Sequence, residues 1–271
     1  MLGPDSARYL IAGEGLPVAR PFHLRWLLPA VCRDRPSRWR AVWLASWPIA
    51  AFGCAWWASG MVDGWQVPLA AAALLVALPG VWGPSVARPI GVDMPALAVG
   101  LIAAALWVHG LDVPAVIVAA LAATMKETSP VWVALWCWSP WPLLALAAPA
   151  IAAIVRRPAI DEVTAHPNLI RVHDHPVRSA MEHRRGRWRD AWTMVAPWGA
   201  TLAALVAPDR QTIATLAVAH AQLLVATDTV RLLATTAGPV MALAAAETYP
   251  AAWLPLIVAA HAVWWRKPEL V

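Results

Sequence analysis

Long apolar runs, separated by short polar breaks, repeat along almost the whole chain. They are dense in Ala, Leu and Val, and most approach the roughly 20 residues with which a helix crosses a bilayer. Because a backbone in lipid must hydrogen-bond to itself, the runs predict helices and no sheet. We therefore expect an all-α protein, a polytopic transmembrane helix bundle of eight or nine spans. The runs lie near residues 41–60, 67–83, 94–109, 113–125, 130–155, 192–207, 211–226, 229–246 and 250–265.

One run is too short to cross a bilayer alone. Residues 113–125 would give a helix of roughly 20 Å, since each residue rises about 1.5 Å. Either the helix continues through Lys126 and Glu127 to the membrane boundary, or it is tilted and buried in the bundle.

A second run leaves the number of crossings open. The sequence SPWP at 139–142 interrupts residues 130–155, and proline breaks or kinks a helix. The run is therefore one long span, two crossings or a re-entrant pair. With one crossing, the Arg-rich segments 1–40 and 156–190 lie on opposite sides of the membrane, and with two they lie on the same side.

The alternation of polar and apolar segments divides the chain into four parts. Residues 1–40 form an N-terminal juxtamembrane segment, and 41–155 form a first transmembrane bundle. Residues 156–190 carry eight arginines and predict a basic amphipathic loop on the cytoplasmic side, because positive charge in short loops sets orientation. Residues 191–271 form a second transmembrane bundle.

Composition narrows the class of protein. The chain is 60% hydrophobic and 14% charged, against roughly 45–50% and 25% in soluble domains. Its nineteen Trp residues suit the boundary between lipid and water. These values predict an integral membrane protein of a bacterial-type plasma membrane. The net charge of +5 then points to membrane lipids with anionic head groups as partners, and not to nucleic acid.

Three cysteines, far apart in the sequence, form neither a disulfide framework nor a metal-ligand spacing. The sequence HDH at 173–175 lies among arginines, which would repel a cation. No metal site is predicted.

Polar residues at the ends of apolar runs are the candidates for chemistry, and each has a simpler structural explanation. Asp93 stands where the run 94–109 begins, where an aspartate serves as a helix cap. Lys126 and Glu127 form either an interfacial ion pair or a site in which the lysine meets a phosphate. Asp228 and Arg231 are three residues apart, so they share a helix face and suit a local salt bridge.

The order of these short motifs resembles the GT-C superfamily, the multispanning glycosyltransferases that use polyprenyl-phosphate sugars. Four stretches carry the resemblance: DSARYLIAGEGLPVARPFHLRWLLP at 5–29, VDMPAL at 92–97, ATMKETSP at 123–130 and DTVRLLATTAGP at 228–239. The resemblance implies that the protein moves a sugar from a polyprenyl-phosphate donor to an acceptor at the outer membrane face. It also implies that residues 1–40 lie at that face.

The resemblance assigns expected roles residue by residue. Asp5 is the expected general base, with Glu14 in reserve, and Asp93 orders the outer loop or helps to bind the acceptor or a metal. Glu127 is expected to hold Lys126 in place. The only cofactor question left open is a divalent cation, and the lipid-linked sugar is the donor substrate. The expected phosphate- and substrate-binding residues are Arg20, Arg25, Lys126, Glu127, Asp228 and Arg231.

A second class stays open beside the enzyme. A non-catalytic polytopic membrane scaffold, or a phage-type membrane factor, would show the same apolar runs. The position of Asp93, Lys126 and Asp228 discriminates between them, because an active site needs all three near one membrane face.

Overall fold

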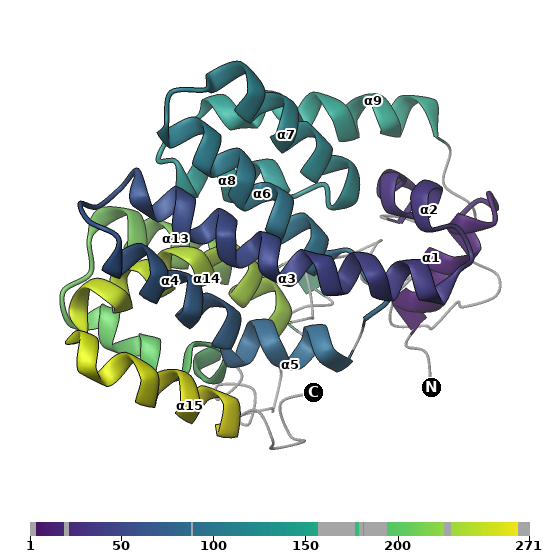
Figure 1. The fold of residues 1–271 in the computed structure, drawn as a ribbon. Helices are drawn as coiled ribbons and strands as arrows, with labels where there is room; N and C mark the ends of the chain where they lie inside the picture. The colour runs from purple at the N-terminus through teal and green to yellow at the C-terminus, as the bar shows by residue number, and fades with distance from the viewer. Residues whose placement is uncertain are drawn as a thin grey trace. The chain divides into compact units, whose positions relative to one another are not determined.

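The computed structural model describes residues 4–18, 22–87, 89–156, 177–178, 181, 194–224 and 229–264. Every regular element in these ranges is a helix, and no strand occurs among them, so the all-α prediction is confirmed for the described chain. Figure 1 shows the described helices. The chain divides into two compact units. Unit 1 comprises 1–63 and 85–164, and unit 2 comprises 64–84 and 165–271.

Each predicted run corresponds to one or more helices. The helices up to the first bundle's end are α1 (Pro4–Gly13), η1 (Phe22–Leu24), α2 (Leu27–Cys32), α3 (Pro36–Ser59), α4 (Gln66–Ala77), α5 (Pro79–Ala87), α6 (Asp93–Val108), α7 (Asp112–Met125), α8 (Ser129–Trp136), η2 (Trp141–Leu146) and α9 (Ala147–Val155). Those that follow are η3 (Ala196–Val206), α13 (Arg210–Ala221), η4 (Gln222–Leu224), α14 (Thr229–Thr248), η5 (Ala251–Trp253) and α15 (Leu254–Trp264).

Two runs are divided where the sequence places a proline. Leu78 leaves the helical conformation just before Pro79, so the run 67–83 becomes α4 and α5. SPWP separates α8 from η2 and α9, so the run 130–155 is not one continuous helix.

One described helix is long and apolar enough to cross a membrane. Helix α3 has 24 residues, or about 36 Å at 1.5 Å per residue. Only 33% of its most apolar window is buried, so most of that surface faces outward from the protein. The other apolar helices are shorter; α6 has 16 residues and α7 has 14.

In unit 1, helix α6 is the central element, and α3, α7 and α8 pack against it. Small residues allow the close approach. A side-chain carbon at Gly53 of α3 would lie 3.0 Å from the Leu101 side chain, and one at Gly60 would lie 2.6 Å from Val108. On the α8 side, a carbon at Gly100 would lie 3.3 Å from the Trp136 ring.

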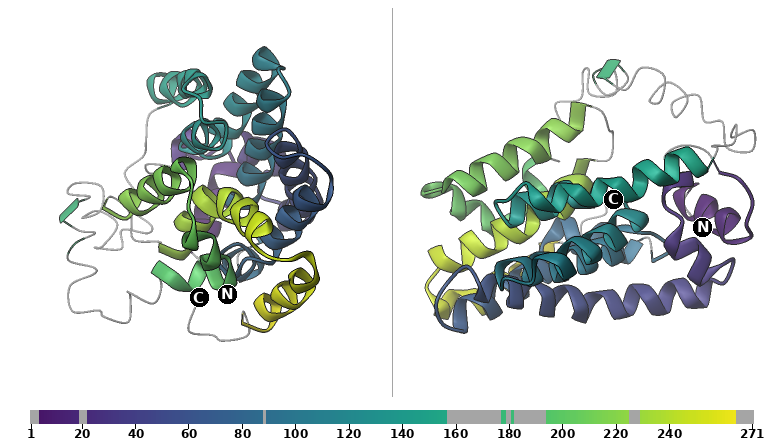
Figure 2. Two further views of the ribbon diagram at one scale, coloured as in Figure 1. Left: turned by 90° about the vertical axis from the view of Figure 1, so that its left-hand side faces the viewer. Right: turned by 90° about the horizontal axis from the view of Figure 1, so that it is seen from above.

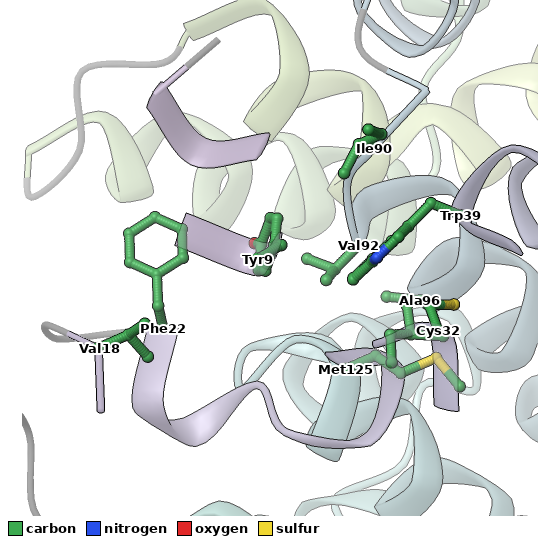
Figure 3. Close-up of a cluster of buried hydrophobic side chains, with 10 residues drawn as sticks. Tyr9, Val18, Phe22, Cys32, Trp39, Ile90, Val92, Ala96 and Met125 are labelled. Carbon is green, nitrogen blue, oxygen red and sulfur yellow. The ribbon is translucent and has the colours of Figure 1, made fainter. Parts of the chain in front are cut away.

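The N-terminal segment of unit 1 is folded onto its core. Tyr9 and Phe22 make an edge-to-face contact at 5.2 Å, and Tyr9 also contacts Trp39 at 5.6 Å (Figure 3). The Ser6 hydroxyl donates to the Ile90 carbonyl at 2.8 Å. The apolar content of residues 5–29 is therefore used in packing. Buried hydrophobic residues of this cluster are Tyr9, Val18, Phe22, Leu28, Cys32, Trp39, Ile90, Val92, Ala96 and Met125.

Unit 2 is organised around α14, which packs against α4, α13 and η3 (Figure 2). Residues 64–84 belong to this unit, although the apolar pattern groups them with the first bundle. The physical reason is the fit of α4 against α14, where Leu75 and Leu78 lie against Gly238. Helix η3 is kinked at Gly199, whose φ of 51° suits glycine. Beyond the kink, His261 accepts the Ala200 N–H at 2.8 Å.

Candidate functional site

Charged side chains from four separate segments meet within unit 1. We name this group, together with one tyrosine, the ionic cluster. Three members lie on α1, and one lies just after η1. One lies at the start of α6, and two lie at the junction between α7 and α8. The members of the ionic cluster are Asp5, Arg8, Tyr9, Arg25, Asp93, Lys126 and Glu127.

Local structure explains why these side chains meet. Asp5, Arg8 and Tyr9 are spaced i, i+3 and i+4, so they share one face of α1. Helix α7 ends at Met125, and the next residue, Lys126, takes an extended conformation with φ −146° and ψ 115°. This break turns Lys126 and Glu127 away from the path of α7 before α8 begins.

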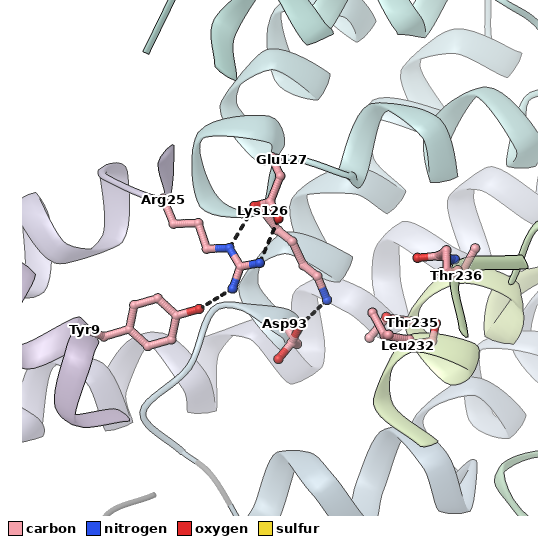
Figure 4. A network of polar contacts seen from close by, with 9 residues as sticks. Tyr9, Arg25, Asp93, Lys126, Glu127, Leu232, Thr235 and Thr236 are labelled. Atoms are coloured by element: carbon pink, nitrogen blue, oxygen red, sulfur yellow. Dashed lines mark hydrogen bonds and ion pairs between the residues drawn. The ribbon is translucent and has the colours of Figure 1, made fainter. Parts of the chain in front are cut away.

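Arg25 connects the N-terminal segment to the α7–α8 junction (Figure 4). Its Nε and Nη2 donate to the two carboxylate oxygens of Glu127 at 2.7 and 2.8 Å. Its Nη1 donates to the Tyr9 hydroxyl at 2.9 Å. A forked, charge-assisted pair of this kind holds both side chains in a fixed orientation. The partner of Glu127 is thus Arg25, which corrects the expectation that Glu127 holds Lys126 in place.

Lys126 is instead paired with Asp93. The side chain of Lys126 is 4% exposed and that of Asp93 is 13% exposed, so both charges are largely removed from water. The Lys126 ammonium also lies 4.7 Å from the centre of the Trp132 ring, within cation–π distance. Asp93 occupies the first turn of α6, and its carboxylate takes part in the ion pair with Lys126.

Phe22 adds a second aromatic surface to the ionic cluster. The guanidinium of Arg8 lies 5.0 Å from the Phe22 ring centre, and that of Arg25 lies 5.3 Å from it. Arg8 also pairs with Asp5 at 3.4 Å. Asp5 is the most exposed of the three carboxylates, with 26% of its side chain accessible, against 13% for Asp93 and 22% for Glu127.

Burial and charge change the acidity of two members. Burial raises the pKa of Tyr9 to about 12; Arg25 partly opposes the rise, while the charges of Asp93 and Asp5 add to it. Burial alone would raise the pKa of Glu127, but the charge and hydrogen bonds of Arg25 outweigh it and lower the pKa. Tyr9 is therefore a neutral hydroxyl and Glu127 an anion at neutral pH.

The charges of the ionic cluster are balanced. It holds three cations and three carboxylates, so its formal charges cancel among the described members. A proton taken up by one carboxylate would leave the cluster with an excess positive charge, which favours a negative charge developing beside it.

The other expected site residues do not join the ionic cluster. Glu14 is exposed just after α1 ends, and nine residues from Asp5 correspond to about 13 Å along a helix. Arg20 and Asp228 lie outside the described residues, as does the HDH sequence at 173–175. Arg231 belongs to α14 of unit 2.

Sequence reasoning assigned no role to Tyr9, Arg8 or Trp132. The first two share a helix face with Asp5, a spacing that could have marked them once α1 was recognised as a helix. Trp132 follows Lys126 by six residues across a helix break, and no simple periodicity links the two.

Among the described residues, no group of three or more His, Cys, Asp or Glu side chains is placed to hold a metal ion. No family model matches this chain, and no curated protein or solved structure is detectably similar to it. The residues themselves must therefore carry the functional argument.

Proposed function

We propose that the chain is an integral membrane glycosyltransferase, which moves a sugar from a polyprenyl-phosphate donor to an acceptor. The observation that carries the proposal is the convergence of Asp5, Asp93 and Lys126 around the buried Tyr9 in unit 1. The sequence resemblance to the GT-C superfamily supports it, because the same residues lie in the motifs that carry the resemblance.

The distribution of residue sizes on α7 supports placement in a membrane. Without water, helices associate through close packing, so small residues face the bundle and large apolar residues face lipid. On the inner side of α7 are the buried alanines Ala115, Ala119, Ala122 and Ala123. On its outer side are large apolar residues, exposed by 71, 58 and 46%: Val113, Ile117 and Leu121.

Helix α3 also exposes large apolar residues, although its buried side holds Trp39 and Trp57 beside small residues. Its buried positions include Ala50, Gly53 and Ala58, whereas Leu44 and Phe52 are 60% and 62% exposed. A soluble protein rarely leaves such a wide apolar surface uncovered. We therefore assign the outer surfaces of α3 and α7 to lipid, which makes more than one helix of unit 1 membrane-embedded.

The proposed reaction needs a base and a stabilised leaving group. The acceptor hydroxyl loses its proton to the Asp5 carboxylate, and its oxygen forms a bond to the anomeric carbon of the sugar. The bond from that carbon to the phosphate oxygen breaks, and its electron pair stays on the phosphate. One negative charge thereby passes from Asp5 to the leaving polyprenyl phosphate.

Lys126 is the cation assigned to the leaving phosphate. Its burial makes its charge more effective than it would be in water, because the local dielectric constant is lower. Arg25 has a different role from the expected phosphate clamp, since two of its nitrogens already bind Glu127 and the third binds Tyr9. We assign Arg25 and Glu127 to positioning the α7–α8 junction that carries Lys126.

A matched pair of variants tests the proposal. Asp5→Asn removes the carboxylate inside the ionic cluster, and Glu14→Gln removes one that lies outside it. Transfer of labelled sugar from a panel of polyprenyl-phosphate donors is measured with purified protein in vesicles. We expect Asp5→Asn to lower transfer at least about 100-fold, the lower range for removing a general base, and Glu14→Gln to leave it unchanged. Equal transfer by Asp5→Asn and the unaltered protein would remove Asp5 as the base.

One observation favours a second function, a non-catalytic membrane scaffold. Each of the three cations in the ionic cluster has a carboxylate partner, as a purely structural network would require. Absence of transfer by the unaltered protein across the donor panel would favour this scaffold.

A further inference from the structure

The directions of the helices in unit 1 show which of its segments lie at the same end. Helices α3 and α6 run in the same direction. Trp39 near the start of α3 packs in one cluster with Val92 at the start of α6, whereas Gly60 after α3 contacts Val108 at the end of α6. The start of α6, and with it Asp93, therefore lies at the same end of unit 1 as the start of α3.

The remaining helices of unit 1 alternate in direction. Helix α7 follows α6 through the short turn at 109–111 and returns, so that Lys126 meets Asp93. Helix α8 leads away again, and the Cys137 thiol after it contacts the carbonyl of Ala104 in the second half of α6. Helix α9 then returns, and Arg156 at its end lies 5.7 Å from the ring of Trp26.

Residues 26 and 156 thus lie at one end of unit 1, which we name the arginine end. Figure 2 shows α9 ending, and α3 beginning, beside the N-terminal helices α1 and α2. Helices α8 and α9, on either side of the breaker in 130–155, run in opposite directions, so Arg156 lies at the same end of unit 1 as Trp26. The opposite end, which we name the far end, carries the turns at 60–63, 109–112 and 137–141.

Positive charge is unevenly divided between the two ends. All Lys and Arg side chains that the structure describes in unit 1 lie at the arginine end, whereas the far-end turns carry Asp63 and Asp112 and no Lys or Arg. The ionic cluster is electrically balanced and does not account for the excess. Outside the ionic cluster, this end carries two exposed carboxylates, Glu14 and Asp34, and five exposed arginines: Arg33, Arg35, Arg38, Arg40 and Arg156.

From this distribution we infer that the arginine end lies at the cytoplasmic leaflet, with the exposed arginines on the head groups of anionic phospholipids. Short segments rich in Lys and Arg stay on the cytoplasmic side, whereas acidic residues contribute little to orientation. Anionic lipids of that leaflet attract basic residues that flank a membrane helix. Arg33, Arg35, Arg38 and Arg40 flank or begin α3, the one described helix of spanning length.

This orientation has a consequence for the site. Asp5, Asp93 and Lys126 lie at the arginine end, so the inferred orientation puts the ionic cluster on the cytoplasmic side. The family resemblance implies the outer face, and the charge distribution opposes it. The inference rests on the membrane placement proposed above, and it is independent of whether sugar transfer occurs.

Two variants, each with one introduced cysteine, test the orientation. Ser37→Cys lies among the arginines before α3, and Met61→Cys lies in the far-end turn; both positions are exposed. Each is made with Cys137→Ser, because Cys137 is partly exposed while Cys32 and Cys54 are buried. Cys137→Ser alone is the control and should not react. Spheroplasts of an expressing bacterium are treated with a membrane-impermeant maleimide, before and after permeabilisation.

We expect Met61→Cys to react in intact spheroplasts and Ser37→Cys to react only after permeabilisation. The reverse pattern, or reaction of both sites in intact spheroplasts, would overturn the orientation. Release of the protein from membranes by alkaline carbonate would overturn the membrane placement, and the orientation with it. Neither result depends on transfer activity, so failure of the orientation and failure of the proposed reaction are distinguishable.

A charge variant tests the role given to the arginines. Arg35→Gln, Arg38→Gln and Arg40→Gln are combined with Asp63→Arg and Asp112→Arg in the Ser37→Cys background. We expect reaction of Ser37→Cys in intact spheroplasts to rise several-fold, because part of the population inserts with the opposite orientation. Unchanged protection of Ser37→Cys would show that these arginines do not set the orientation.

Discussion

The ion pair between Lys126 and Asp93 should show strong energetic coupling. Removing one partner of a buried pair costs about 3–5 kcal/mol, because the other charge is left without compensation, whereas removing both is often close to neutral. The Asp93 side chain keeps 13% of its exposure and the Lys126 side chain 4%. We therefore expect Lys126→Met to cost about 3 kcal/mol, the lower end of that range, since water can reach the remaining carboxylate.

The double variant is the informative measurement. Lys126→Met with Asp93→Asn should cost at least about 1 kcal/mol less than the sum of the single variants, a coupling typical of residues in contact. Unfolding in detergent can be followed with a fluorogenic maleimide, because Cys32 and Cys54 are fully buried and should react only when unit 1 unfolds. For a protein of this size, 1 kcal/mol corresponds to about 2–4 °C in Tm, so Lys126→Met should lower Tm by roughly 6–12 °C.

The control is Asp63→Asn, an exposed carboxylate in the turn after α3, which should change stability by less than about 0.5 kcal/mol. Cys137→Ser is included in every variant to remove the partly exposed thiol. If Lys126→Met behaves like Asp63→Asn, or if the single effects are simply additive, the ion pair does not stabilise unit 1 as argued.

Three further outcomes are expected. In a Tyr249→Phe background, the absorbance of the Tyr9 phenolate should titrate near pH 12 and not near pH 10. Because the pKa of Tyr9 is raised in the folded protein, the free energy of unfolding should fall between about pH 10 and 12. A titration midpoint near pH 10 would contradict the burial of Tyr9. Gly53→Val should lower stability by about 1–3 kcal/mol in the maleimide assay, since its side chain would meet α6, while exposed Phe52→Val should not. Arg25→Lys keeps the charge but loses the fork to Glu127, and should cost about 1–3 kcal/mol; an unchanged Tm would oppose its positioning role.

The sequence was most informative about the helices. The run 113–125 corresponds to α7 at Asp112–Met125, and 94–109 corresponds to α6 at Asp93–Val108. Apolar runs and prolines are local signals, and helices form through local hydrogen bonds, so the element boundaries are readable from sequence. The number of membrane crossings is a separate matter, because it depends on the lipid-facing surface and not on helix formation.

The pairing within the site was less predictable. Asp93, Lys126 and Glu127 were recognised as unusual because each is a charge beside an apolar run. Their partners were not recognised, since Lys126 pairs across 33 residues and Arg25 reaches Glu127 across 102. Because Lys126 is paired with Asp93, removing Lys126 leaves a largely buried carboxylate without compensation.

The double variant of Lys126→Met with Asp93→Asn also tests the central claim, that the ionic cluster is a site of sugar transfer and not only a structural network. In this variant the lost charges cancel, so unit 1 should remain folded while the cation for the leaving phosphate is absent. Transfer of labelled sugar from a polyprenyl-phosphate donor is measured at equal amounts of folded protein. The account predicts transfer at least about tenfold below that of the unaltered protein, or about 1.4 kcal/mol of lost transition-state stabilisation. Undiminished transfer by the folded double variant would contradict it.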